Sequence, residues 1–212
     1  MKTRFLLLAT LVLLLFTQCT DSDQGDPLIE LSVVNRDAVA FPRDGKSAVE
    51  MDAKPGDGLA VFNSIEFDNG TIAVDLKGEN NPGKSFIGIA FNIQNDSTYE
   101  AIYFRPFNFV AEEQIRKEHM VQYIFHPEFG WNRLRTDRTG EFEAQLPPPP
   151  NPDDWFRAFI TVSPTSVQVR LSKKGSPVLD VPRLSEPTSS KIGYWVGHNS
   201  SGRFDNLKVE TE

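Results

Sequence analysis

A glutamate lies inside an unusually aromatic segment, Tyr-Glu-Ala-Ile-Tyr-Phe-Arg-Pro-Phe-Asn-Phe at residues 99–109. A carboxylate among apolar side chains must be paired or have a shifted pKa. Glu100 is therefore the leading candidate for a catalytic acid or base. Arg105 is either its salt-bridge partner or a catalytic assistant, although strict alternation along a strand would place the two on opposite faces. The catalytic and structural interpretations of Glu100 both stay open.

Planar aromatic rings are interleaved with amide and guanidinium groups in several other segments. Sugar binding uses flat apolar faces for C–H stacking and planar polar groups for paired hydrogen bonds to hydroxyls. The residues that we expect to bind such a ligand are Tyr103, Asn108, Trp131, Trp155 and Trp195. Tryptophans also fill protein cores, so their presence favours a sugar site without establishing one.

Trp195 has a glycine two residues away on either side, Gly193 and Gly197. Glycine weakens a strand, so some benefit should offset that cost. We expect these glycines to leave the indole accessible to a flat ligand. His198 follows directly and is a further catalytic candidate. The residues that we expect to line or border one sugar-sized cleft are Glu100, Arg105, Trp195 and His198. The alternative is that Trp195 fills the core and Glu100 neutralises an arginine.

Several other kinds of site are missing from the sequence. Cys19 is the only cysteine, which excludes an intrachain disulfide and a zinc knuckle. There is no Gly-x-Ser-x-Gly elbow, phosphate-binding glycine loop or His-Glu-x-x-His pair. His119, His126 and His198 are scattered, and single histidines on strands are usually structural. We expect no cofactor and no metal, with calcium left as an option although no Asp-rich loop demands it.

Composition and charge narrow the class of protein. The 212 residues are 39% hydrophobic and 24% charged, which is typical of a folded soluble domain. Lys and Arg total 22 against 29 Asp and Glu, a formal net charge of -7. An acidic chain is a poor binder of polyanions, so we expect no nucleic acid partner.

The first residues have the order of a secretion signal. Two positive charges precede an apolar run at residues 5–16, which ends close to Cys19. That run is shorter than the roughly 20 residues that span a membrane. The pattern resembles a bacterial lipoprotein signal, although Gln18 stands where a small residue is usual. The alternative is an ordinary signal peptide in which Cys19 is incidental. We expect residues 1–19 to be a signal peptide with lipidated Cys19, and residues 20–28 to be a flexible, acidic tether.

Residues 29–212 read as one all-β domain. Residues 71–77 place Ile72, Val74 and Leu76 on one face, which is the period of a strand. Further strands are expected at 86–93, 99–105, 121–126, 155–163, 167–172, 191–197 and 204–210, separated by turn residues. Evenly spaced strands predict a jelly-roll sandwich of two antiparallel sheets. One short helix is expected within 109–120, and a rim loop from 127 to 154. The expected core residues are Ile72, Val74, Leu76, Ile87, Ile89, Phe91, Ile160, Val162, Leu207 and Val209.

The sequence resembles a known family over roughly residues 30–210. The stretches at 67–78, 83–91, 99–109 and 191–209 are similar to the laminin-G-like, concanavalin A-like jelly rolls of the bacterial 3-keto-disaccharide hydrolases. The resemblance implies a carbohydrate or glycoside ligand on the concave sheet. It supplies no complete catalytic set.

Three functions from different classes follow. The chain is a lipid-anchored glycoside hydrolase, a carbohydrate-binding lipoprotein without catalysis, or an interaction module for another envelope protein. Two facing carboxylates about 5–10 Å apart would favour hydrolysis. In each case we expect a cell-envelope location at the outer membrane, facing either the periplasm or the surface, with membrane contact through the lipid alone.

The lipid anchor is directly testable. Mass spectrometry of the wild type should show an acylated Cys19 at the mature N-terminus, and Cys19→Ser should abolish the modification and release the protein from membranes. A wild-type protein that is already soluble and cleaved elsewhere would contradict the anchor.

Overall fold

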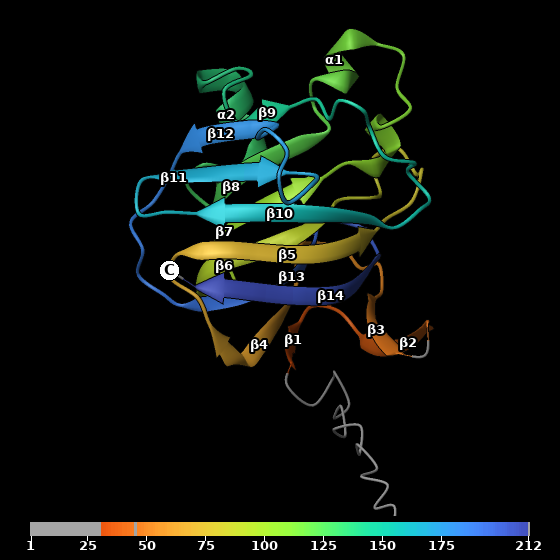
Figure 1. Cartoon of the computed structure of the whole chain (residues 1–212), viewed down its shortest axis with the longest axis vertical. Helices are drawn as coiled ribbons and strands as arrows, with labels where there is room; N and C mark the ends of the chain where they lie inside the picture. The colour runs from red at the N-terminus through yellow and green to blue at the C-terminus, as the bar shows by residue number, and fades with distance from the viewer. Residues whose placement is uncertain (1–30, 45, 212) are drawn as a thin grey trace, which may run out of the picture.

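The computed structural model describes residues 31–44 and 46–211, which form two seven-stranded antiparallel sheets packed face to face (Figure 1). This arrangement confirms the predicted all-β, concanavalin A-like jelly-roll sandwich. The signal peptide, Cys19 and the tether at 20–28 lie outside the described residues. Among the residues described, no helix is both long and apolar enough to cross a membrane.

Each of the two sheets combines strands that are distant from one another in the sequence. Sheet A has the order β1 (Leu31–Val34), β4 (Gly58–Glu66), β13 (Lys191–Val196), β6 (Ile87–Asn95), β7 (Thr98–Phe104), β8 (Val121–His126) and β9 (Glu143–Ala144). Sheet B has the order β12 (Leu179–Pro182), β11 (Ser166–Arg170), β10 (Phe156–Val162), β5 (Gly70–Lys77), β14 (Gly202–Thr211), β3 (Lys46–Met51) and β2 (Ala38–Arg43).

Two-residue alternation fixes which side chains meet between the sheets. In β5, Ile72 and Leu76 are fully buried, and their strand partners in β10 are Ile160 and Phe156. Tyr194 of sheet A stacks on Phe204 of sheet B, with ring centroids 4.3 Å apart. Each large apolar side chain buried here stabilises the fold by roughly 1.5–3 kcal/mol, so this interface holds the layers together.

Eight of the ten predicted core residues are buried. Leu207 and Val209 are only half-buried, although both pack against the core. A register shift between Asp205 and Lys208, which includes Leu207 and ends next to Val209, interrupts the pairing of β14 with β5. The prediction holds for strands with regular pairing and weakens where β14 is irregular.

The single short helix expected within 109–120 is confirmed as the four-residue helix α1 (Gln114–Lys117). A 3-10 turn, η1 (Pro106–Asn108), comes just before that segment. Pro106 begins the first turn, and no side chain caps either element. The expected rim loop at 127–154 also contains a helix, α2 (Trp131–Asp137), and the short strand β9. These segments cover part of the outer face of sheet A.

Candidate functional site

A row of five paired residues crosses the outer face of sheet A. Trp195 on β13 pairs with Gly88 on β6, which pairs with Tyr103 on β7. Tyr103 in turn pairs with Gln122 on β8, and Gln122 pairs with Glu143 on β9. Because paired residues point to the same face of a sheet, the row places four side chains on one surface, with Gly88 leaving a gap between Trp195 and Tyr103.

Gly88 allows two aromatic rings to meet across it. A Cβ at this position would lie 2.0 Å from the Ile102 carbonyl oxygen, so only glycine fits so close to β7. With no side chain between them, the rings of Trp195 and Tyr103 pack at a centroid distance of 4.9 Å. Both side chains are nearly buried, with Trp195 3% exposed. They form the floor of the site.

The floor extends along β7 to Tyr99. The indole Nε1 of Trp195 donates to the Tyr99 hydroxyl at 3.1 Å, and that hydroxyl donates to Asp57 Oδ2 at 2.9 Å. The ring of Tyr99 stacks on His126, with centroids 5.3 Å apart. Burial and the Asp57 carboxylate raise the pKa of Tyr99, so its hydroxyl stays protonated. This chain fixes the orientation of the Asp57 carboxylate at the opening.

Arg105 connects the floor to one wall. Alternation places it on the same side as Tyr103, and its Nη2 contacts both the Tyr103 hydroxyl, at 2.6 Å, and Gln122 Oε1. Its Nη1 donates to Glu143 Oε1 and to the His119 carbonyl, each at 3.0 Å. Burial raises the pKa of Tyr103 to about 12, so the phenol remains neutral beside the guanidinium.

The Glu143 carboxylate also contacts Arg135 and His119 on this wall. Arg135 of α2 donates to Glu143 Oε1 from Nη2 at 2.7 Å, and His119 Nε2 lies 3.1 Å from Oε2. Burial, opposed by Glu143, lowers the pKa of His119, so the imidazole is neutral at neutral pH. One carboxylate thus holds α2, the 106–119 segment and the end of β7 together.

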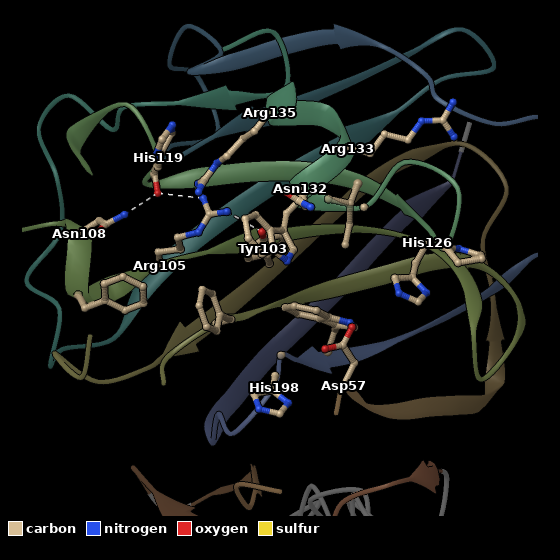
Figure 2. A pocket seen from close by; sticks show the side chains of 18 of the residues that line it. Asp57, Tyr103, Arg105, Asn108, His119, His126, Asn132, Arg133, Arg135 and His198 are labelled. Carbon is tan, nitrogen blue, oxygen red and sulfur yellow. Dashed lines mark hydrogen bonds between the residues drawn. The ribbon is translucent and has the colours of Figure 1, made fainter. Parts of the chain in front are cut away.

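These elements enclose a cleft of about 880 Å³ on the outer face of sheet A. That volume falls in the usual range for small-molecule sites. Figure 2 shows Tyr103 at its centre, between His119 and Arg135 on one side and Asp57 and His198 on the other. Trp131 lies on the α2 wall and is 53% exposed, which makes it the open aromatic of the cleft.

The structure brings most of the predicted site residues together. Those that line the cleft are Tyr103, Arg105, Asn108, Trp131, Trp195 and His198. Asn108 is held by the His119 carbonyl and by Arg116, so its amide is fixed in orientation. His198 is exposed, and its Nδ1 accepts from the Gly56 amide at 2.9 Å. Trp195 is a floor residue rather than the open platform that its glycine neighbours suggested.

Trp155 does not line the cleft, contrary to the sequence-based expectation. It immediately precedes β10 of sheet B, and the Arg43 guanidinium lies 3.9 Å above its ring. Arg43 also pairs with Asp75 and Asp205, so Trp155 belongs to a polar network with residues of sheet B.

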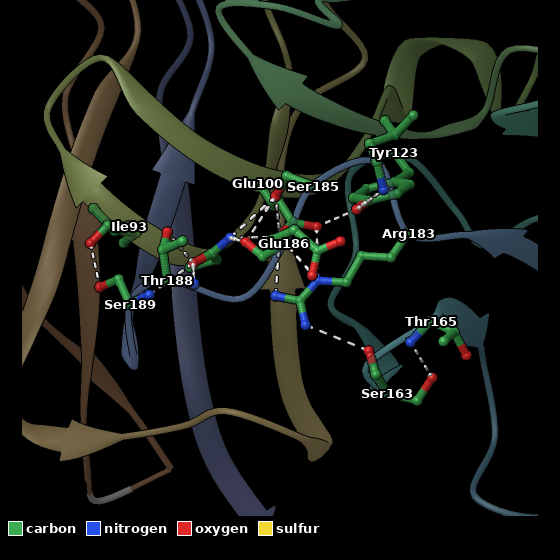
Figure 3. A network of polar contacts seen from close by, with 12 residues as sticks. Ile93, Glu100, Tyr123, Ser163, Thr165, Arg183, Ser185, Glu186, Thr188 and Ser189 are labelled. Carbon is green, nitrogen blue, oxygen red and sulfur yellow. Dashed lines mark hydrogen bonds and ion pairs between the residues drawn. The ribbon is translucent and has the colours of Figure 1, made fainter.

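Glu100 also lies away from the cleft, because alternation turns it to the inner face of sheet A. It is fully buried, and Arg183 pairs with it at 2.9 Å (Figure 3). Asn92, Ser185 and the Tyr123 hydroxyl also donate to its two oxygens. With both oxygens occupied and no path to the cleft, Glu100 is a poor candidate for catalysis in this geometry. Its contacts instead fix the β12–β13 connection.

Sequence reasoning missed part of the cleft. Asp57 and Tyr99 are joined across 42 residues of sequence, and no local pattern announces that contact. The α2 wall was hidden because Gly130 precedes a seven-residue helix without a capping side chain. Arg133 and Arg135 flank Leu134, the only buried residue of α2, but this spacing is not that of one helix face, so the sequence carried no clear signal for the helix.

All three histidines of the chain line the same cleft. They are nevertheless spread around it, since His119 contacts Glu143, His126 contacts the Ser97 carbonyl and His198 contacts Gly56. Within residues 31–44 and 46–211, no group of three or more His, Cys, Asp or Glu is arranged to hold a metal ion.

No protein-family model matches the chain, and no curated protein matches its sequence. Solved structures do match its fold. A carbohydrate-binding module, CBM66 from Bacillus subtilis, superimposes with a TM-score of 0.59 at 12% identity, covering 86% of this chain and 96% of that one. This likeness supports the jelly-roll β-sandwich fold.

Two further structures agree with this assignment. A Bacillus subtilis protein with a galectin-like fold gives a TM-score of 0.56 at 12% identity, covering 87% of this chain and 90% of that one. The exoplasmic/lumenal domain of VIP36, in a form bound to Ca2+ and Man3GlcNAc, gives 0.51 at 14% identity, covering 86% of each chain. At these identities the likeness establishes the fold alone.

The structural role of Glu100 predicts a measurable cost. Glu100→Gln removes the negative charge opposite a buried Arg183 and should lower the free energy of unfolding by about 3–5 kcal/mol, measured in denaturant. Glu210→Gln is the matched control, because it breaks an exposed ion pair with Lys173 that is worth about 1 kcal/mol or less. Equal, small effects in the two variants would contradict the structural role.

Proposed function

We propose that the protein binds carbohydrate in the cleft on the outer face of sheet A. One observation carries the proposal: aromatic rings and fixed planar hydrogen-bonding groups line the same sugar-sized space. The rings of Trp131, Trp195 and Tyr103 supply apolar surface for sugar C–H groups. Arg105 and Asn108 present planar donors and acceptors whose orientations are already set by neighbouring contacts.

Preorganisation makes this site suited to binding. A ligand that meets side chains already held in place loses less of its binding energy to ordering them. Asp57 is oriented by Tyr99, and Asn108 by the His119 carbonyl and Arg116. Trp131 is the exception, because it is exposed on a short helix, so a stacked sugar would add to its order.

Comparison with similar folds supports the same ligand class. One similar structure is named as a carbohydrate-binding module, and the VIP36 domain was solved with bound Man3GlcNAc. The chain's resemblance to 3-keto-disaccharide hydrolases adds a glycoside as the substrate hypothesis. VIP36 also carries Ca2+, so calcium is a condition to vary in any binding assay.

Hydrolysis is the second candidate function. Of the described residues that line the cleft, Asp57 and Glu128 carry carboxylates. Asp57 favours this candidate because the Tyr99 hydroxyl fixes its side chain. A glycosidase needs two such groups flanking the scissile bond. Hydrolysis by this protein would therefore depend on Asp57 rather than Glu100.

We further propose that the domain is tethered to the cell envelope through Cys19, at the outer membrane and facing the periplasm or the surface. The nine residues at 20–28 would connect the lipid to the sandwich. Such a tether would keep the cleft near envelope or extracellular glycans without membrane contact by the domain itself.

A glycan array with a parallel hydrolysis screen tests the proposal. For a glycan that binds, Trp131→Ala should weaken affinity about 2- to 10-fold, because one stacking ring contributes about 0.5–1.5 kcal/mol. Trp155→Ala is the matched control, since it removes a tryptophan outside the cleft and should leave affinity unchanged. Equal losses in both variants, or no binding to any glycan, would contradict the proposed site.

A further inference from the structure

The residues that line the cleft include more basic than acidic side chains, the opposite of the chain as a whole. Acidic residues outnumber basic ones over the whole sequence, 29 against 22. Among the residues that line the cleft, two carboxylates face four arginines, and no lysine is present. The arginines are Arg105, Arg116, Arg133 and Arg135. Positive charge is therefore gathered where a ligand would sit.

Two of these arginines have nearby counter-ions of their own. Arg116 lies 3.5 Å from Glu113, and Arg133 lies 3.3 Å from Asp137. These pairs are exposed, so they contribute little to either stability or local charge. The excess positive charge of the cleft therefore lies at the other two arginines, Arg105 and Arg135.

Arg105 and Arg135 share a single carboxylate. Both guanidinium groups donate to Oε1 of Glu143, at 3.0 and 2.7 Å. The side chains of Glu143 and Arg105 are 3% and 5% exposed, so water screens this pair weakly, whereas the side chain of Arg135 is 30% exposed and can be reached by a ligand. Among the described residues, both arginines form their ion pairs with Glu143, so two positive charges share one negative charge at the cleft wall.

The neighbouring groups do not supply the missing negative charge. Burial raises the pKa of Tyr103, so its phenol is neutral, and burial lowers the pKa of His119, so its imidazole is neutral. Gln122 uses its oxygen for Tyr103 and Arg105, while its buried amide nitrogen has no hydrogen-bond partner. The wall thus has a surplus of donors as well as of positive charge.

We infer that the ligand of this cleft is an acidic saccharide whose carboxylate binds beside Arg105 and Arg135. The inference rests on the proposed carbohydrate binding and specifies its ligand class. A guanidinium is planar and matches the two oxygens of a carboxylate, whereas lysine offers only a point charge. A carboxylated sugar would neutralise the surplus charge while its ring stacks on Trp131, over whose ring the Arg135 guanidinium lies at 5.3 Å.

The test measures affinity of the full-length protein for three matched probes, in a detergent without a sugar headgroup. The probes are an oligogalacturonate, a neutral galacto-oligosaccharide of equal length and a sulfated galacto-oligosaccharide. The carboxylated probe should bind at least about tenfold more tightly than the neutral one, because a charged hydrogen bond adds at least that much. Its affinity should fall as salt rises from about 0.05 M to about 0.5 M.

Variants then locate the interaction. Arg135→Gln should weaken binding of the carboxylated probe about tenfold or more, and should weaken binding of the neutral probe much less. Arg135→Lys keeps the charge but loses the planar fork, so its loss should be smaller. Arg138→Gln is the control: it removes equal charge beside α2, yet Arg138 pairs with Glu141 outside the cleft, so affinity should stay within about twofold. Thermal unfolding verifies that each variant is folded.

The outcomes separate the inference from the proposed function. Equal binding of neutral and carboxylated probes, with Arg135→Gln silent, overturns the inference and leaves carbohydrate binding intact. Preference for the sulfated probe overturns the carboxylate assignment. Equal losses in Arg135→Gln and Arg138→Gln overturn the placement beside Arg135. Absence of binding to every saccharide overturns the proposed function itself.

Discussion

The two-residue alternation of the central strands of sheet A is the constraint on which the site depends. In β7 it sends Glu100, Ile102 and Phe104 inward and Tyr99 and Tyr103 outward. The inner set joins the core and the buried network around Arg183, while Tyr103 of the outer set lies in the floor of the cleft and Tyr99 supports Trp195 and Asp57. A shift of one residue in register would exchange the two sets, so the core and the cleft are specified together.

The outer face becomes a cleft because charged residues hold its cover in place. Glu143 joins β9 to Arg105 at the end of β7, to Arg135 on α2 and to His119 after α1. Without that carboxylate, several buried donors would lose their partner at a cost that a short helix could not offset. Because one carboxylate serves two arginines, the wall carries more positive than negative charge. The architecture of the wall is thereby connected to the charge of the inferred ligand.

The sequence predicted features that depend on local periodicity. The core face of β5 and the shared side of Tyr103 and Arg105 follow from alternation alone, and the turn residues marked where strands end. The pairing of strands does not follow, because it is set by contacts between distant segments. Trp155 was assigned to the cleft for its residue type, and only the position of β10 in sheet B shows otherwise. Arg183, the partner of Glu100, is 83 residues away in the sequence, so local periodicity could not predict this pair either.

The three tryptophans make the central claim directly measurable, because each indole N–H is a separate probe. One lies on the cleft wall, one in its floor and one outside the cleft, at Trp131, Trp195 and Trp155 respectively. Titration of the ¹⁵N-labelled protein with an oligosaccharide that it binds should shift the indole N–H signals of Trp131 and Trp195 in the NMR spectrum. The indole signal of Trp155 should stay unchanged. A shift confined to Trp155 would place the ligand away from the cleft and contradict the account.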